Sequence, residues 1–426
     1  MSASNGVQGN AAASRSAYIA GSVGSIIEWY DFAIFGAFAV VLARVFFPAD
    51  DEMAGVLRTF AIFGVGFIAR PLGAIVFGSL GDRIGRRRTL MIAIVAIAVP
   101  TVLMACLPTP AQIGQWATLL LVALRFLQGF SAGGEGGGAI TFIGEHAAAG
   151  RRARAINWAE SAITCGLLLG AVVAFAISSA LSESQLDAWG WRLAFALTLP
   201  LLVIGAIVRR GAGESPEFEA ARDEGRVVAH PVAAVARSHA GALIRGFFLI
   251  GGGYAFYYFL ATFIPAFLQM HAGLTFSTSF LLATLNLAVV IVTYRVSAEI
   301  SDRWGARRTV LAGSAVLLVV AYPAWLLITH GGTAPAALGG VLLSIAIGLV
   351  VVPQIVILME SFPTELRYTG YSLTANVAGA VFGGTVAFAA TGLMMTSGSA
   401  RAPIAIVVGA ALMTLIVAAL YPRDAD

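Results

Sequence analysis

The chain alternates between long apolar runs and short polar connections. A helix needs about 20 mostly apolar residues to cross the hydrocarbon core of a bilayer. Runs of comparable length occur at approximately 18–46, 56–80, 89–107, 116–143, 155–181, 190–209, 241–270, 275–298, 309–329, 335–359, 370–395 and 402–421. The pattern predicts an all-α integral membrane protein with twelve transmembrane helices.

The longest polar interval divides the twelve runs into six and six. The sequence therefore predicts a polar N-terminal tail over 1–17, an N-terminal six-helix bundle over 18–209, a cytoplasmic linker over 210–240, a C-terminal six-helix bundle over 241–421 and a C-terminal tail over 422–426. A repeat agrees, because GDRIGRRRT at 81–89 returns as SDRWGARRT at 301–309. Two repeated halves are a common transporter plan, with the substrate near the bilayer midplane between them.

Composition and charge support a membrane protein. Hydrophobic residues make up 59% of the chain and charged residues only 11%, whereas a soluble domain carries about 25% charged residues. The basic residues are all arginines, and most lie in connections on one side of the predicted membrane. This distribution places both termini in the cytoplasm and indicates contact with a lipid bilayer, not with nucleic acid. The cysteines and histidines show no metal-ligand spacing, so we expect neither a metal nor a cofactor.

Six charged residues interrupt the apolar runs of the first half, and the second half has no equivalent set. A charged side chain at the bilayer centre costs about 2.5–3.5 kcal/mol on insertion scales, so it normally pairs with another group or faces a cavity. Structural ion pairs that lock helices together are therefore the alternative to a functional role. The six residues are Glu28, Asp31, Arg70, Arg125, Glu135 and Glu160.

Polar residues also fall on one face of three predicted helices, because neighbours on a helix recur every three or four residues. These faces are expected to line a central cavity. They comprise Gly21, Gly24, Glu28 and Asp31 in the first run, Arg125, Gln128, Ala132 and Glu135 in the fourth, and Asn157, Glu160 or Ser161, and Thr164 in the fifth. Low dielectric disfavours the charged form of a carboxyl group. Because four carboxyl groups accompany only two arginines, we expect at least one acid to hold a proton near neutral pH.

Several motifs resemble those of a known transporter family. The loop GDRIGRRR resembles the signature of the major facilitator superfamily, and other stretches are similar to its metabolite:proton symporter family. These stretches are EWYD at 28–31, RPLG at 70–73, RFLQGFSAGGE at 125–135, WGWR at 189–192, ESP at 214–216 and FPTELRYTG at 362–370. The resemblance implies transport of carboxylates such as citrate, 2-oxoglutarate or shikimate, or of zwitterions such as proline and betaine, together with protons.

Proton coupling is assigned to acids of the first and fourth spans. We expect Asp31 and Glu135 to carry the transported proton, and the sequence does not separate Glu28 from Asp31 in this role. If the charges are instead structural, Glu160 in the fifth span is the residue most expected to anchor one helix to another.

Substrate binding is assigned first to Arg125, because a guanidinium offers a planar fork that matches two carboxylate oxygens. Arg70 precedes Pro71, so it is expected either to bind substrate or to bond backbone carbonyls freed by a bend. Neutral polar groups can orient a ligand by hydrogen bonds. The candidates of this kind are Gln128, Tyr30, Asn157, Tyr257 and Asn376.

The family resemblance also implies a cytoplasmic latch in the repeated loop. Membrane topology alone explains its arginines, but it does not explain Asp82 and the repeated Asp302. The expected gating residues are Gly81, Asp82, Arg83, Gly85, Arg86, Arg87, Asp302 and Arg303.

Taken together, these features predict a proton-coupled symporter that takes up a small carboxylate, such as a di- or tricarboxylate or a keto acid, across the inner (cytoplasmic) membrane by alternating access. Uptake of a zwitterionic osmolyte is the main alternative. Efflux of a drug or metabolite by antiport fits less well, because six buried charges suit a small polar ligand. We expect a monomer and not an enzyme, with the substrate, protons and the lipid bilayer as its partners.

Overall fold

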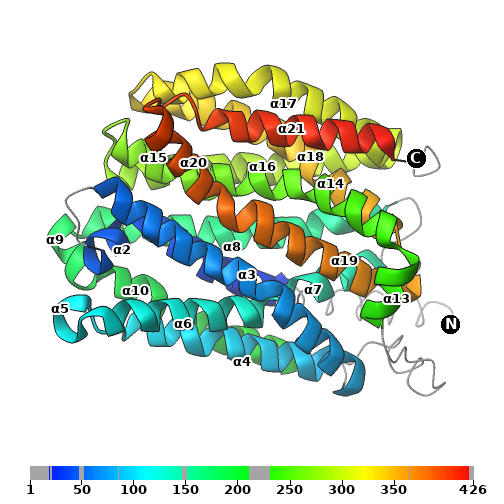
Figure 1. Cartoon of the computed structure of the whole chain (residues 1–426), viewed down its shortest axis with the longest axis horizontal. Coiled ribbons are helices and arrows are strands. Elements are labelled where there is room, and N and C mark those ends of the chain that lie inside the picture. Colours follow the sequence, from blue (N-terminus) through cyan, green and yellow to red (C-terminus); the bar gives the residue numbers. More distant parts are fainter. Residues whose placement is uncertain are drawn as a thin grey trace, which may run out of the picture.

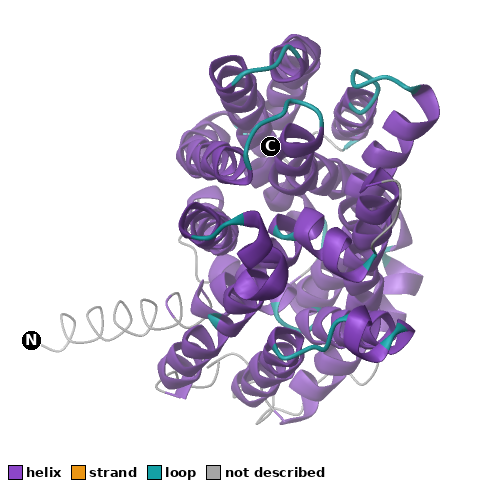
Figure 2. Cartoon of the chain, turned by 90° about the vertical axis from the view of Figure 1, so that its left-hand side faces the viewer, coloured by secondary structure: helices purple, strands orange, loops and turns teal. Residues whose placement is uncertain are grey.

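The helices of this protein run side by side along its long axis. The computed structural model describes residues 19, 22–47, 52–84, 86–145, 151–210, 231–362 and 364–421, and within these ranges the chain is helical and contains no strand. Figure 1 shows the helices of the N-terminal half mainly below those of the C-terminal half. Figure 2 shows most of the helices end-on. The all-α fold class is confirmed.

The helices of the N-terminal half follow the first six predicted runs. Their bounds are Ser22–Ala37, α2 (Ala39–Phe46), α3 (Glu52–Ile84), α4 (Arg86–Ala105), α5 (Pro110–Ile113), α6 (Gln115–Ala132), α7 (Gly136–Glu145), α8 (Arg152–Ala180), α9 (Glu183–Gln185), the π-helical turn η1 (Leu186–Gly190), α10 (Trp191–Ala196) and α11 (Thr198–Arg210).

The C-terminal half continues in the same way. Its elements are α13 (Pro231–Ser238), α14 (Ala240–Tyr258), η2 (Phe259–Phe263), α15 (Ile264–Met270), α16 (Phe276–Trp304), α17 (Ala306–Thr329), α18 (Thr333–Glu360), α19 (Thr364–Ala378), η3 (Gly379–Gly383), α20 (Gly384–Ser397) and α21 (Ile404–Leu420).

The described helices account for the twelve predicted spans. Eight helices are long and apolar enough to cross a membrane, and the bent pair Ser22–Ala37 and α2 makes a ninth span. The other three predicted runs correspond to α4, which contains the shorter apolar helix Met91–Ala105, to α6 followed by α7, and to α21. Each apolar run of the sequence therefore became a helix or a closely spaced pair of helices.

Two spans are interrupted where the sequence predicts continuous helices. The first bends by 58° between its two parts. The fourth is broken by a turn over residues 133–135, between α6 and α7. Glycine is a weak helix former, and Gly133 and Gly134 occupy this turn. Glu135 consequently lies at a break between two helices instead of within one.

Three tails and linkers of the predicted layout are wholly or partly outside the described residues. They are the tail over 1–17, most of the linker over 210–240 and the tail over 422–426. Residues 231–238 of that linker form α13, a helix that the sequence analysis did not predict. The boundaries of the two bundles stay predictions.

Glycines bring α6 unusually close to α3. A methyl group added at Gly129 would overlap the backbone of Gly66, and one added at Gly133 would overlap the backbone of Arg70. Small residues four apart allow the backbones of membrane helices to approach in this way. The glycines at these two positions therefore support tight packing of the fourth span against α3.

The two halves touch each other near both ends of α8. Near its first turn, the backbone N–H of Ala153 donates a hydrogen bond to Asp302 Oδ1 of α16 at 3.1 Å. Near its last turn, the hydroxyls of Ser178 and Ser179 each lie 3.1 Å from the hydroxyl of Ser277, also in α16. The halves also touch between these two ends, where the hydroxyl of Tyr257 in α14 donates to Thr164 in the middle of α8 at 2.9 Å.

The glycine contact at Gly129 can be tested by adding one methyl group. Because the backbone of Gly66 cannot move aside as a side chain would, Gly129→Ala is expected to destabilise the protein by about 1–3 kcal/mol. The matched control is Gly409→Ala in α21, where an added methyl group meets nothing within 4 Å. Thermal unfolding of both purified variants measures the effect. A Gly129→Ala protein as stable as the control would contradict the packing described above.

Candidate functional site

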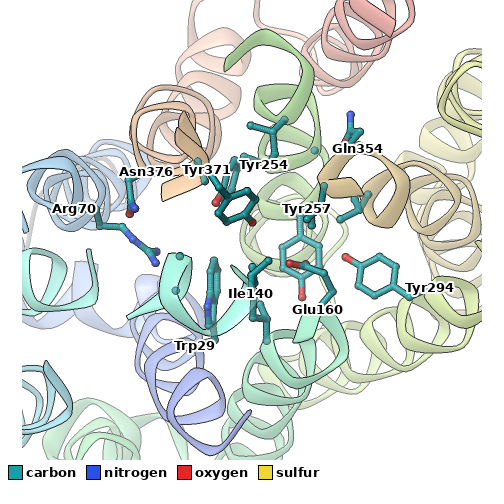
Figure 3. A pocket seen from close by; sticks show the side chains of 18 residues that line it. Trp29, Arg70, Ile140, Glu160, Tyr254, Tyr257, Tyr294, Gln354, Tyr371 and Asn376 are labelled. Atoms are coloured by element: carbon teal, nitrogen blue, oxygen red, sulfur yellow. The ribbon is translucent and has the colours of Figure 1, made fainter. Parts of the chain in front are cut away.

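A cavity lies between the two halves (Figure 3). Both halves contribute polar and aromatic side chains to it, as expected of a site that closes around a small solute. Its lining consists of Trp29, Arg70, Gly136, Gly137, Ile140, Glu160 and Ile163 from the N-terminal half, and Ile250, Gly253, Tyr254, Tyr257, Tyr294, Val351, Gln354, Ile355, Tyr371, Ala375 and Asn376 from the C-terminal half.

Arg70 supplies the positive charge of the lining. Its guanidinium forms a buried ion pair with Glu28 of the first helix. The guanidinium carbon also lies 5.2 Å from the centre of the Trp29 ring and 5.1 Å from that of Phe32. Aromatic faces attract a cation within about 6 Å. Among the described residues, Arg70 forms an ion pair at the cavity wall and no hydrogen bond to a backbone carbonyl, and its role in substrate binding stays a prediction.

Asp31 is fully buried one helical turn from Glu28 and does not line the cavity. Its carboxylate accepts hydrogen bonds from the hydroxyl of Thr198 at 2.6 Å and from that of Thr101 at 2.8 Å. The amide of Gln128 donates to the same Thr101 oxygen at 2.8 Å. Asp31 therefore belongs to a hydrogen-bonded network that ties together the first helix, α4, α6 and α11.

Arg125 lies in the same network and also outside the cavity lining. One guanidinium nitrogen, Nη1, donates to the side-chain oxygen of Gln128. The guanidinium carbon lies 4.3 to 5.0 Å from the ring centres of Phe32, Phe35 and Phe63. The other two nitrogens have no hydrogen-bond partner in the described part of the chain. The residue expected to grip the substrate thus occupies an aromatic box behind the cavity wall.

The other predicted acids and amides are distributed around this core. Glu135 is fully buried at the break between α6 and α7. The next residue, Gly136, lines the cavity, and a methyl group added there would lie 3.7 Å from Arg70 and 3.8 Å from Glu28. Glu135 therefore directly precedes a residue, Gly136, that lies close to the Arg70–Glu28 pair.

Only part of the predicted set of neutral ligand-binding residues reaches the cavity. Tyr257 lines it and donates from its hydroxyl to Thr164 at 2.9 Å, and Asn376 lines it and donates to the carbonyl of Ser372 at 2.8 Å. Tyr30 and Asn157 do not line it.

Tyr30 and Asn157 have local partners instead. The hydroxyl of Tyr30 donates to the carbonyl of Ala194 at 2.8 Å, which joins the first helix to α10. The side-chain oxygen of Asn157 accepts from the hydroxyl of Ser161 one turn along α8 at 3.3 Å. Both residues occupy the helices expected, but their side chains are engaged away from the cavity.

The aromatic lining residues that the sequence analysis did not single out include Trp29, Tyr294 and Tyr371. Trp29 stands directly after Glu28 in a motif already singled out, so the signal for it was present. Tyr294 and Tyr371 have no such signal, since tyrosines in membrane helices also serve in packing. Glu160, which the sequence analysis placed on a polar helix face and also considered as a helix anchor, lines the cavity.

The contact zone at the start of α8 contains the gating residues that the structure describes. Besides the bond from Ala153, the Asp302 carboxylate lies 3.7 Å from Arg154 Nε, and Arg152 pairs with Glu360 at 2.7 Å. Carboxylates are stabilised at the N-terminus of a helix by its dipole. Arg303 is exposed.

The first copy of the repeated loop cannot be compared with this zone. Gly85 lies outside the described residues, and the side chains of Gly81, Asp82, Arg83, Arg86 and Arg87 are likewise outside what the structure describes. Their gating role stays a prediction.

Twelve membrane-spanning helices in two halves, with a charged cavity between them, define a multi-pass membrane transporter and not an enzyme. Residues 21–381 match the Major Facilitator Superfamily. The chain belongs to this superfamily, which confirms the resemblance drawn from its motifs.

The curated relatives of the chain include several transporters of small metabolites. It is 32% identical to the citrate-proton symporter of Klebsiella pneumoniae over 89% of this chain and 85% of the relative. It is also 32% identical to the proline/betaine transporter of Escherichia coli K12, over 88% of this chain and 77% of that relative. Its identity to the shikimate transporter of the same organism is 32% as well, over 97% of this chain and 95% of the relative. A solved structure of the proton:xylose symporter XylE shares the fold, with a TM-score of 0.77 at 18% identity over 96% of this chain and 95% of that chain.

The contact between Asp302 and the start of α8 gives a prediction about access to the cavity. Asp302→Asn removes the charge that faces the helix N-terminus, so the two halves are expected to separate more often at this end. The measurement uses a variant in which Cys106 and Cys165 are replaced by serine and Ala375, in the cavity lining, by cysteine. A membrane-impermeant maleimide applied from the side of Asp302 should label this cysteine several-fold faster in the Asn variant.

The matched control for this experiment is Glu299→Gln, which removes a carboxylate from the same helix. Glu299 pairs with Arg295 on a partly exposed face, so its loss should leave the labelling rate unchanged. Equal labelling of the Asp302→Asn and parent proteins would show that this contact does not restrict access.

Proposed function

We propose that the protein is a proton-coupled symporter that takes up a small solute bearing a carboxylate group across the inner (cytoplasmic) membrane. The observation that carries this proposal is the buried Arg70–Glu28 ion pair at the wall of a cavity between the two halves. The relatives of the chain include a citrate-proton symporter and a proline/betaine transporter, and the solutes in these names carry a carboxylate group.

Arg70 is the residue best placed to bind the carboxylate. Its guanidinium lines the cavity, and one of its nitrogens is engaged by Glu28. A planar guanidinium binds a carboxylate through two parallel hydrogen bonds. We therefore assign to Arg70 the role that the sequence analysis gave first to Arg125, and we assign Arg125 to the network around Asp31.

Asp31 is the proposed site of the transported proton, as the sequence analysis expected. A buried carboxylate loses its hydration, and the loss is offset only by hydrogen bonds and nearby charge. Here Thr101 and Thr198 donate to the carboxylate. Protonation turns an acceptor into a donor, so at least one of these bonds must reverse or break. Gln128 donates to Thr101 and accepts from Arg125, so a rearrangement at Thr101 would alter the hydrogen bonds of both residues.

Glu28 connects the proton site to the solute site. It lies one helical turn before Asp31 and is paired with Arg70. Movement of the first helix on protonation of Asp31 would alter this pair and thus the availability of Arg70 for the solute. In the proposal, Glu28 and Glu135 adjust the charge around Arg70, and Tyr257 and Asn376 orient the bound solute from the C-terminal half.

Alternating access would come from opening one contact zone at a time. At one end of α8 the halves are joined by Asp302 and by the Arg152–Glu360 pair, and at the other end by Ser178, Ser179 and Ser277. Rocking of one half against the other about a central site is the usual motion of transporters built from two repeats. The serine contacts are neutral and the Asp302 zone is charged, so the two zones differ in sensitivity to salt.

A pair of lysine substitutions separates the roles of the two arginines. Lysine keeps the charge but loses the fork. Arg70→Lys is expected to weaken solute binding about tenfold or more, whereas Arg125→Lys should keep the affinity within about threefold of the unmodified protein. The two variants should therefore differ by roughly 0.7 kcal/mol or more in binding free energy. Equilibrium binding of a transported solute to each purified variant measures this. If Arg125→Lys shows the larger loss, the assignment of Arg70 is wrong.

Asp31→Asn tests the proton site. The asparagine side chain cannot take up a transported proton, so uptake into proteoliposomes should no longer exceed the equilibrium level when a pH gradient is imposed. Exchange of internal for external solute without a gradient should continue, because the cavity is unaltered. The control is Asp187→Asn, which removes a half-exposed carboxylate paired with Arg44 at the end of the first span. Gradient-driven accumulation by Asp31→Asn would refute this assignment.

A further inference from the structure

Glu160 differs from the other buried acids of the N-terminal half in the surroundings of its carboxylate. The residue is only 8% exposed, and it lines the cavity from α8. Within the described part of the chain its carboxylate makes no hydrogen bond and no ion pair. By contrast, Glu28 is paired with Arg70, and Asp31 accepts bonds from two hydroxyls. A buried carboxylate that the protein itself does not pair is stabilised in its charged form when a ligand brings a cationic group to it.

Aromatic rings surround the space in front of Glu160. Tyr257 and Tyr294 lie beside it, and Trp29 and Tyr371 lie between it and Arg70 in the view of Figure 3. Tyr254 contributes a further ring to the same lining. The faces of aromatic rings carry negative potential and attract cations, and rings arranged around a cavity are the usual means of binding an alkylated ammonium group. The rings and the carboxylate therefore favour the same kind of ligand group.

The charges of the cavity are arranged in two poles. Arg70 and Glu160 lie on opposite sides of it (Figure 3). Because Glu28 already balances Arg70, the negative charge of Glu160 remains in excess. A solute with several carboxylates would meet this excess as repulsion, whereas a solute with one carboxylate and one cationic group would complement both poles.

We propose that Glu160 and the rings of Trp29, Tyr254, Tyr257 and Tyr371 form a subsite for the alkylated ammonium group of a zwitterionic solute. The carboxylate of the same solute lies at Arg70, and in this respect the inference rests on the function proposed above. Glu160 is thus the residue that determines the charge class of the cargo. Between the two classes left open by the sequence, the zwitterion is favoured over the di- or tricarboxylate.

A pair of ligands with the same shape tests this subsite. Trimethylglycine carries a quaternary ammonium group, and 3,3-dimethylbutanoate has a carbon atom in place of that nitrogen, so the two differ only in the positive charge. Equilibrium binding to the full-length protein is measured by calorimetry. The unmodified protein should bind trimethylglycine at least about tenfold more tightly, and Glu160→Gln should reduce this ratio to below about threefold. Glu160→Asp, which keeps the charge, should retain most of the preference.

Two further variants keep the test decisive if Glu160→Gln does not fold. Tyr254→Leu removes one ring of the subsite and should weaken trimethylglycine binding several-fold more than dimethylbutanoate binding. Tyr254→Phe keeps the ring and should behave as the unmodified protein does. Glu299→Gln serves as the control for the loss of a carboxylate remote from the cavity.

Three results would overturn the subsite. They are equal binding of the two matched ligands by the unmodified protein, a preference that survives Glu160→Gln, and binding of neither ligand. Failure of the underlying transport proposal gives a different pattern. If citrate is accumulated in response to a pH gradient and trimethylglycine is not bound, the result supports proton-coupled symport and refutes the subsite. If trimethylglycine binds with the expected preference over dimethylbutanoate but never accumulates under a pH gradient, the result supports the subsite and refutes proton coupling.

Discussion

The buried ion pair between Arg70 and Glu28 is the interaction on which the rest of the site depends. Neither charge can be hydrated fully at this depth, and several kcal/mol per ion are lost when it leaves water. The pair and the surrounding rings of Trp29 and Phe32 offset this loss. Because Arg70 is held in place by a group of another helix, its guanidinium is presented to the cavity in a fixed direction.

The acids of the N-terminal half are distinguished by what surrounds them and not by their chemistry. Glu28 faces a guanidinium, Asp31 faces two hydroxyls, and Glu160 faces rings and the cavity. The same carboxyl group thus serves as a counter-ion, as a hydrogen-bonded buried acid and as an uncompensated charge. A proton carrier and a cation receptor can be proposed within one bundle because these environments are kept apart, with Asp31 walled off from the cavity that Glu160 lines.

Close helix packing sets these environments. Gly129 and Gly133 allow α6 to lie against the backbone of α3, so that Arg125 of α6 and Arg70 of α3 are held at neighbouring depths. A larger residue at either glycine would push the helices apart and displace both guanidinium groups. The tight crossing and the turn at residues 133–135 together direct Arg125 into the aromatic box and place Gly136 at the cavity wall.

The sequence by itself determined the number of spans, the positions of the charged residues and the membership of the superfamily. Each depends on local information, since hydropathy and helical spacing are properties of a single segment. The sequence also showed which residues share a helix face, but it did not show which face of each helix lines the cavity. The rotation of a helix about its axis depends on its packing partners, and only the tertiary structure supplies them. For this reason only the structure placed Arg70 and Glu160 in the cavity lining and Arg125 behind it, beside Phe32, Phe35 and Phe63. It also brought Tyr294 and Tyr371 from two helices of the C-terminal half to the same cavity as Trp29.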